Sequence, residues 1–128
     1  MEHKKRERRS SERIEILGAT VNYKVDNSFL SKKKYDDEIL PVIDISQGGI
    51  RFFGLKSLKS ARKLSMKIHI PEEDDPLLLK GHVRWASPIS SISYRYQIGV
   101  QFNTYGLEKG QNPPEMKTRI IKLEKKYR

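Results

Sequence analysis

The sequence predicts a small, mostly β domain in which six short antiparallel strands form a barrel or sandwich and one C-terminal helix packs against it. Three observations carry this prediction. Apolar and polar residues alternate through most of the chain from Ile14 onward, which is typical of strands with one buried face. Turn-forming residues separate these stretches. Convincing helical spacing occurs only near the C-terminus, and 128 residues suffice for one hydrophobic core.

The strands are expected at residues 14–25, 39–46, 49–53, 64–70, 77–86 and 94–102. Alternation is clearest in the last of them, where Ile98, Val100 and Phe102 share one face. Successive side chains of a strand point to opposite sides of the sheet. The same parity in the fifth strand places Val83 and Trp85 inward.

The helix is expected at the end of the chain. Asn112 is a residue type that caps helices, Pro113 suits a first turn, and Glu115 follows three residues after the cap. Apolar residues then recur at helical spacing, at Met116, Ile120, Leu123 and Tyr127. Such an amphipathic face can dock on a sheet. The expected organisation is an N-terminal arm over 1–13, a β-barrel over 14–111 and a helix over 112–128.

Charge is distributed unevenly along the chain. The formal net charge is +10, which suggests an anionic partner. Residues 1–13 hold six basic and three acidic residues, a net +3, and residues 115–128 hold six basic and two acidic residues, a net +4. The rest of the chain therefore carries only +3. A body so close to neutral is not typical of a domain that binds duplex nucleic acid.

Composition also bears on the compartment. The chain has no cysteine, which excludes a disulfide scaffold and a thiolate metal site and fits a reducing environment. No apolar run reaches the length of a membrane helix, and no apolar segment follows the basic start as in a secretory signal. We therefore expect a cytoplasmic protein without a membrane span.

The first motif of interest lies near the N-terminus. The stretch RRSSER, residues 8–13, places Arg9 and Arg13 four positions apart. Taken alone, it is typical of a solvated basic tail. Because this segment has little apolar surface to bury, we expect it to be a flexible N-terminal arm.

The second motif is DISQGG, residues 44–49. Strand parity places Asp44 and Ser46 together on the outer face of the sheet. Gly48 and Gly49 suit a tight turn and also let a ligand come close to the backbone. Taken alone, this motif is typical of an ordinary hairpin.

Together, the two motifs resemble the signature of the PilZ family, RxxxR followed further along the chain by DxSxxG. Five signature positions match in the same order: Arg9, Arg13, Asp44, Ser46 and Gly49. The later stretches LKGHVRW (79–85) and YQIGVQF (96–102) also resemble strands of that family. The resemblance implies a six-stranded antiparallel PilZ-like β-barrel with a C-terminal α-helix and a flexible N-terminal arm.

The resemblance also implies a ligand, cyclic di-GMP, which contains two guanines and two phosphates. An arginine can meet one guanine edge with two hydrogen bonds, stack on the base, and pair with a phosphate. Asp44 can accept the N–H donors of the other edge, Ser46 can add a hydrogen bond, and Gly49 avoids a Cβ that would strike the base. We expect Arg9 and Arg13 to close over the ligand.

Three further residues complete the candidate site. Arg8 adjoins the first motif, and the resemblance implies a contact there to a second, stacked ligand molecule. Gly48 allows the ligand to approach the turn. Arg51 shares the outer face with Gly49 and is an accessory candidate, although a solvated strand arginine is the more common interpretation of such a residue.

These expectations describe a receptor or adaptor. Cyclic di-GMP would order the arm, and that change would signal to an effector protein which the sequence does not identify. Catalysis finds little support, because His3, His69 and His82 lie far apart and lack a carboxylate at a metal-ligand or general-base spacing. We expect no enzyme activity, no metal site and no cofactor beyond the ligand.

Two alternatives stay open. Basic termini also suit a β-barrel that binds nucleic acid, but single-strand binders expose aromatic residues for base stacking, and parity places Trp85 and Tyr96 inward. Phe52 and Phe53 are consecutive, so one of them must point outward. The other alternative is a PilZ-like protein-interaction module that binds no nucleotide, and the intact signature argues against it.

Overall fold

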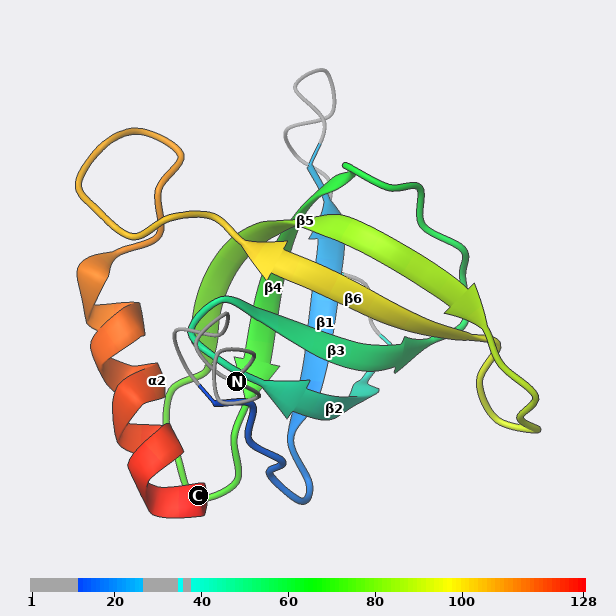
Figure 1. The fold of residues 1–128 in the computed structure, drawn as a ribbon, viewed down its shortest axis with the longest axis horizontal. Coiled ribbons are helices and arrows are strands. Elements are labelled where there is room, and N and C mark those ends of the chain that lie inside the picture. The colour runs from blue at the N-terminus through cyan, green and yellow to red at the C-terminus, as the bar shows by residue number, and fades with distance from the viewer. Residues whose placement is uncertain (1–11, 27–34, 36–37) are drawn as a thin grey trace, which may run out of the picture.

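The six predicted stretches form six strands that close into an antiparallel barrel, and the C-terminal helix packs beside it (Figure 1). The computed structural model describes residues 12–26, 35 and 38–128. The elements are β1 Thr20–Val25, β2 Leu40–Ile45, β3 Gly49–Gly54, β4 Lys63–His69, β5 Leu77–Pro88, β6 Tyr96–Phe102 and α2 Pro114–Tyr127. The order around the barrel is β1-β2-β3-β6-β5-β4. The predicted mostly β, six-stranded fold with a C-terminal helix is confirmed.

The first strand is shorter than predicted. Residues 14–25 were expected to form one strand, but β1 begins only at Thr20. Gly18 has a φ of +88°, a backbone conformation that glycine adopts without strain, and the chain turns there. The segment before the turn makes an isolated antiparallel bridge between Ile14 and Ile45.

The barrel interior contains the inward residues of each strand. Phe52, Leu64, Met66, Ile68 and Ile98 are fully buried. Each such side chain contributes about 1.5–3 kcal/mol through its removal from water. The predicted inward positions of Ile98, Val100 and Phe102 are confirmed, since all three are buried. Tyr96, predicted on the same face, is only partly buried at the start of β6.

The predicted inward position of Trp85 is wrong. The register between β5 and β6 shifts between Val83 and Trp85, which is the mark of a β-bulge. Val83 is fully buried, whereas Trp85 is 38% exposed. The extra residue places both Arg84 and Trp85 on the outer side of the barrel.

Phe52 and Phe53 point to opposite sides of the barrel wall, as expected for consecutive residues of a strand. Phe52 packs inside the barrel with its ring centroid 5.9 Å from that of Tyr23. Phe53 lies on the outer side and stacks on Tyr94 at 5.8 Å.

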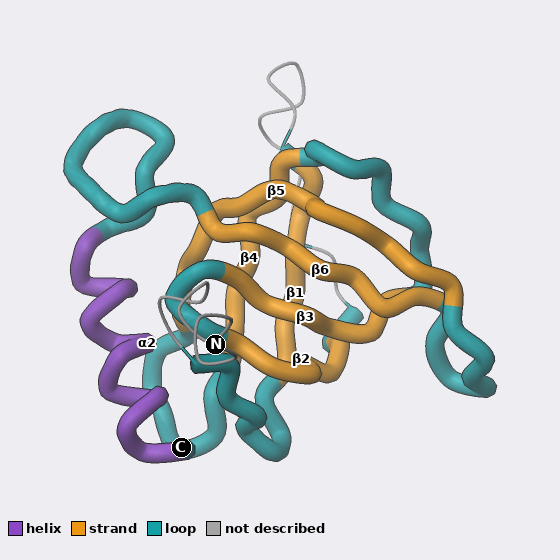
Figure 2. The backbone as a smooth tube through the Cα atoms, in the orientation of Figure 1, coloured by secondary structure: helices purple, strands orange, loops and turns teal. Residues whose placement is uncertain are grey.

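Helix α2 runs along one side of the barrel (Figure 2). Ile120 and Leu123 are buried against the core, and Met116 and Tyr127 are partly buried, so the predicted apolar face is confirmed. Within the described part of the chain, no helix is long and apolar enough to cross a membrane.

The predicted cap of this helix is wrong. Pro113 occupies the N-cap position and no side chain caps the helix. Asn112 is 1% exposed, and its amide accepts from the Lys80 N–H at 2.7 Å and donates to the carbonyls of Lys80 and Asn103 at 3.0 Å each. Its side chain thereby fixes the chain before α2 to strand β5.

Candidate ligand-binding site

The segment that carries Arg13 is joined directly to the strand that carries Asp44. The Ile14 N–H donates to the Ile45 carbonyl at 2.9 Å, and the Ile45 N–H donates to the Ile14 carbonyl at 3.0 Å. Both side chains are buried. This bridge holds the end of the RxxxR motif against the beginning of the DxSxxG motif.

Asp44 is the centre of a cluster of charged side chains. The Arg51 Nε donates to both carboxylate oxygens at 3.1 Å, and the Arg51 Nη2 lies 2.5 Å from Oδ2. The Arg13 Nη1 donates to Oδ1 at 3.2 Å. Asp44 lies on the outer side as predicted, but it is only 4% exposed because the two guanidinium groups cover it.

Both arginines remain accessible while they hold this carboxylate. The side chain of Arg13 is 37% exposed and that of Arg51 is 33% exposed. The hydrogen bond to Asp44 is the main cause that raises the pKa of the Arg51 guanidinium. A carboxylate has about four lone-pair positions, and the two arginines already use most of them.

The position of Arg51 follows from the turn. Gln47 and Gly48 form a two-residue connection, and the Ser46 N–H donates to the Gly49 carbonyl at 2.9 Å. Counting outward from that closure pairs Asp44 with Arg51 across β2 and β3. The hairpin register is therefore the signal in the sequence that identifies Arg51 as a partner of Asp44, in place of a solvated strand arginine.

Ser46 and Gly49 have structural roles in this turn. The Gly48 N–H donates to the Ser46 Oγ at 3.2 Å, and Ser46 is buried. A Cβ on Gly49 would lie 2.3 Å from the Val100 carbonyl oxygen, so glycine is required for β3 to approach β6. Gly48 is exposed, and the nearest atom to a Cβ there would be 3.9 Å away.

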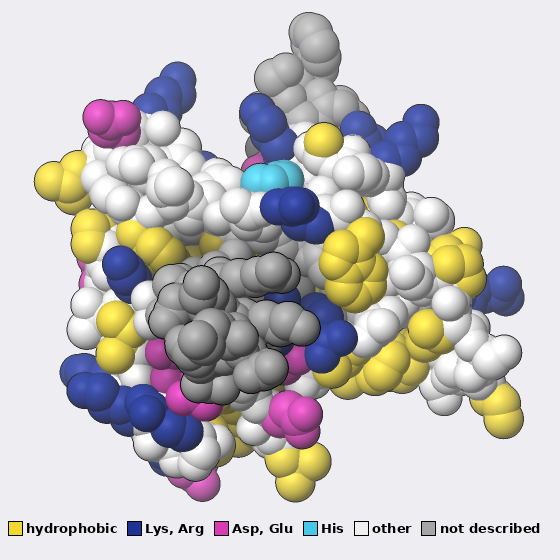
Figure 3. Space-filling model, in the orientation of Figure 1, with side chains coloured by type: hydrophobic (Ala, Val, Ile, Leu, Met, Phe, Trp, Pro, Cys, Tyr) yellow, Lys and Arg dark blue, Asp and Glu magenta, His cyan; other side chains and the backbone are white. Residues whose placement is uncertain are grey.

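The exposed side chain of Trp85 lies on the same face of the barrel, one strand beyond the neighbour of Arg51. Arg51 pairs with Gly99 of β6, which pairs with Trp85 of β5. A Cβ on Gly99 would lie 2.4 Å from Cε2 of Trp85, so the indole covers the glycine. Figure 3 shows hydrophobic and basic side chains side by side on this face. Sequence parity missed Trp85, although a glycine within a strand is itself a sign of close approach.

The structure brings together Arg13, Asp44, Ser46, Gly48, Gly49 and Arg51. Arg8 and Arg9 lie outside the described residues. Among residues 12–26, 35 and 38–128, no group of three His, Asp or Glu side chains could hold a metal ion.

Several solved structures resemble this chain, and two of them are described here. The first is the Bacillus subtilis inhibitor of motility MotI/DgrA, with a TM-score of 0.67, 15% identity, and coverage of 93% of this chain and 50% of that one. The second is MrkH, described as a c-di-GMP-dependent transcription regulatory factor, with a TM-score of 0.58, 15% identity, and coverage of 90% and 48%. This chain spans about half the length of each. At this identity the likeness shows the fold.

A comparison with curated proteins gives no match. The PilZ domain model matches residues 7–112, a span that contains both the RxxxR and the DxSxxG motifs. Because this match covers most of the chain, the protein belongs to the PilZ family.

Proposed function

We propose that this protein is a cytoplasmic receptor for cyclic di-GMP, a binding protein and not an enzyme, which signals to an effector protein. The single observation that carries the proposal is the cluster of Arg13 and Arg51 on Asp44. It combines, at one surface, the cationic and anionic groups that the two edges of guanine require.

Binding would proceed as an exchange of partners. Guanine N–H donors would bind the Asp44 carboxylate, and the arginines that now cover it would move onto acceptors of the ligand. A guanidinium suits the N7 and O6 atoms of the base as well as the phosphates. Arg13 and Arg51 are partly exposed, so they can turn toward a ligand without disturbing the core.

Trp85 would extend the site. Neighbouring strands lie about 4.8 Å apart, so the backbone of Trp85 on β5 is roughly 10 Å from the backbone of Arg51 on β3, with β6 between them. That separation suits a dinucleotide, which can contact Asp44 with one base and stack the other on the indole. Gly99 has no side chain, which leaves room for the indole over β6.

The N-terminal arm would contribute the remaining arginines of the site. Arg9 and Arg13, with Arg8 beside them, would close over the ligand while Asp44 and Ser46 hold it from the barrel. Ordering of the arm would then create or hide a surface for the effector. The motility inhibitor and the transcription regulator support a signalling output of this kind, since both are regulatory proteins with a similar fold.

A second candidate is single-stranded nucleic acid, because Trp85 is exposed beside basic residues. The dependence of binding affinity on salt concentration distinguishes the two candidate ligands. Binding of an oligonucleotide should weaken steeply between 50 and 200 mM salt, since it releases counterions from many phosphates, whereas binding of a dinucleotide should change little.

The test is calorimetric titration of the full chain with cyclic di-GMP at both salt concentrations, with a single-stranded oligonucleotide as comparison. Arg13→Ala should weaken dinucleotide binding, and Lys122→Ala, which changes an exposed helix residue, should not. Amide exchange at residues 5–13 should slow when the dinucleotide is added. Tight, salt-sensitive oligonucleotide binding without dinucleotide binding would favour the second candidate.

A further inference from the structure

Gln47, in the turn of the DxSxxG motif, is hydrogen-bonded to the C-terminal helix. The Gln47 Nε2 donates to the Glu124 Oε1 of α2 at 3.1 Å. The Gln47 carbonyl accepts from the Tyr105 hydroxyl at 2.6 Å. Gln47 is therefore held on both sides while its neighbours Ser46 and Gly48 form the candidate ligand site.

Glu124 is an unusual residue for a helix that packs on a barrel. It is 7% exposed, next to the buried Leu123. Among the described residues, its Oε2 is buried without a hydrogen-bond partner. Burial of a carboxylate costs free energy unless it is well paired, so packing alone does not explain an acidic residue here.

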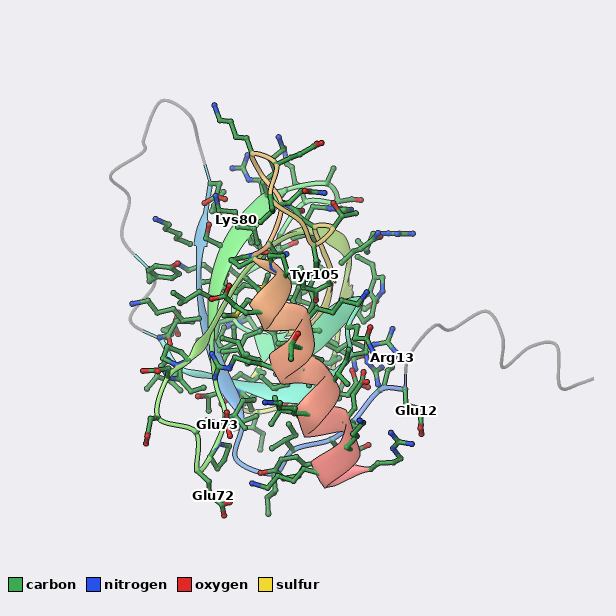
Figure 4. The ribbon with its side chains drawn as sticks, turned by 90° about the vertical axis from the view of Figure 1, so that its left-hand side faces the viewer. Glu12, Arg13, Glu72, Glu73, Lys80 and Tyr105 are labelled. Carbon is green, nitrogen blue, oxygen red and sulfur yellow. The ribbon has the colours of Figure 1, made fainter. Side chains whose placement is uncertain are left out.

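Other polar contacts of α2 are made with the loop at 71–76, and Arg128, directly after the helix, pairs with Glu12 at 3.7 Å. Arg119 donates to the carbonyls of Pro76 and Asp75 at 3.2 and 2.7 Å, and Lys126 pairs with Glu72 at 3.2 Å. Figure 4 shows the helix between Glu72 and Glu73 on one side and Glu12 and Arg13 on the other. The Gln47 contact is thus a link between the helix and the candidate site that is separate from its anchors on the loop at 71–76.

We propose that Glu124 is a positioning residue for the cyclic di-GMP site, acting through Gln47, and that α2 is thereby coupled to ligand occupancy. This inference rests on the proposed function. A ligand on Ser46 and Gly48 must fit the conformation of the residue between them. If Gln47 moves, Glu124 loses its hydrogen bond inside a buried environment, so the ligand and the helix packing influence each other.

Such coupling is reciprocal by thermodynamic linkage. Removal of the Glu124 contact should change ligand affinity, and ligand binding should change amide exchange along α2. The change in ligand affinity and the change in helix stability should both arise from the same coupling free energy between the site and α2. Helix α2 would then report occupancy of the site to an effector together with the arm.

The test compares cyclic di-GMP titrations of wild type, Gln47→Ala, Glu124→Ala and the double variant. Each single change should weaken binding by at least about fivefold, the lower end of common coupling effects. The double variant should be no weaker than either single one, because both remove the same contact. Glu124→Gln keeps an acceptor for Gln47 and should restore affinity, and Lys126→Ala should leave affinity unchanged.

Amide exchange of the wild-type helix, measured with and without cyclic di-GMP, tests the same coupling without a mutation and is decisive if Glu124→Ala fails to fold. Altered exchange at residues 119–127 supports the inference. If wild type binds but Gln47→Ala binds equally well and helix exchange is unchanged, the inference is wrong and the proposed function stands. If wild type does not bind, both are wrong.

Discussion

Arg51 and Asp44 face each other across β2 and β3, and the Arg51 guanidinium contacts both carboxylate oxygens. Arg13 reaches the same carboxylate from the segment before β1. Residues from two motifs that are separated by a strand in the sequence therefore meet at one carboxylate. In the proposed binding mode, a ligand would displace these guanidinium groups from Asp44.

Arg51 should contribute to affinity through hydrogen bonds that lysine cannot reproduce. Arg51→Ala should weaken cyclic di-GMP binding by about tenfold or more, because a hydrogen bond to a charged group contributes about 1.5–3 kcal/mol. Arg51→Lys should give little recovery, since lysine lacks the planar fork. Calorimetry measures both. Wild-type affinity in Arg51→Ala would show that this arginine only neutralises Asp44.

Trp85 offers a direct optical signal, because it is the one tryptophan of the chain. Cyclic di-GMP should change its fluorescence by stacking on the exposed indole. Trp85→Ala should weaken binding by about 1–3 kcal/mol, the usual contribution of base stacking, and Trp85→Phe should retain part of it. Unchanged fluorescence at a ligand concentration that saturates the calorimetric signal would place the ligand elsewhere.

Alanine substitutions at the two glycines of the turn, Gly48 and Gly49, should affect stability differently. Gly49→Ala places a Cβ 2.3 Å from the Val100 carbonyl oxygen and should lower the free energy of unfolding by about 1–3 kcal/mol, as overpacking does. Gly48→Ala meets no atom closer than 3.9 Å and should leave stability unchanged.

Gly48→Ala should nevertheless weaken the binding of cyclic di-GMP if the ligand approaches the turn. Denaturant unfolding and calorimetry on the same two variants distinguish these effects. Equal stability of the two variants would contradict the close approach of β3 and β6.

Tyr105 should make stability sensitive to alkaline pH. Burial and the nearby Glu124 raise the pKa of Tyr105 from 10.0 to about 12. Because the folded-state pKa is the higher one, the unfolded chain loses this proton first, so this contribution to stability is complete below pH 10 and is lost as pH rises toward 12.

Tyr105→Phe should therefore show a shallower decline of the free energy of unfolding over this range, measured by denaturant titration. Tyr127→Phe, which changes the partly buried tyrosine at the end of α2, is the matched control. Identical slopes for Tyr105→Phe and wild type would contradict the role of Tyr105 burial.

The sequence predicts the strands well where alternation is local. Ile98, Val100 and Phe102 are buried as expected, because a period of two residues is a property of the strand itself. Trp85 was misplaced because a bulge depends on how β5 pairs with β6, and that pairing is not local. Asn112 was misassigned for a similar reason, since the partners of its side chain lie on β5 and in the segment after β6.

The candidate site was predicted in part. The two motifs identify Asp44 and Arg13, and the structure places them in contact. The link between Gln47 and Glu124 joins residues 77 positions apart, and no spacing or pattern in the sequence indicates it. Contacts of this kind become visible only when the helix is placed on the barrel.

A calorimetric titration of cyclic di-GMP into wild type and Asp44→Asn, side by side, tests whether the Asp44 carboxylate binds the ligand. The substitution preserves the shape of the side chain and removes the charge that the arginines and the ligand share. Wild type should bind with a micromolar or lower Kd, which corresponds to a binding free energy of about −8 kcal/mol or better, and the variant should bind at least tenfold more weakly. Absence of heat from the folded wild type, or equal affinity of the two proteins, would contradict this role of Asp44.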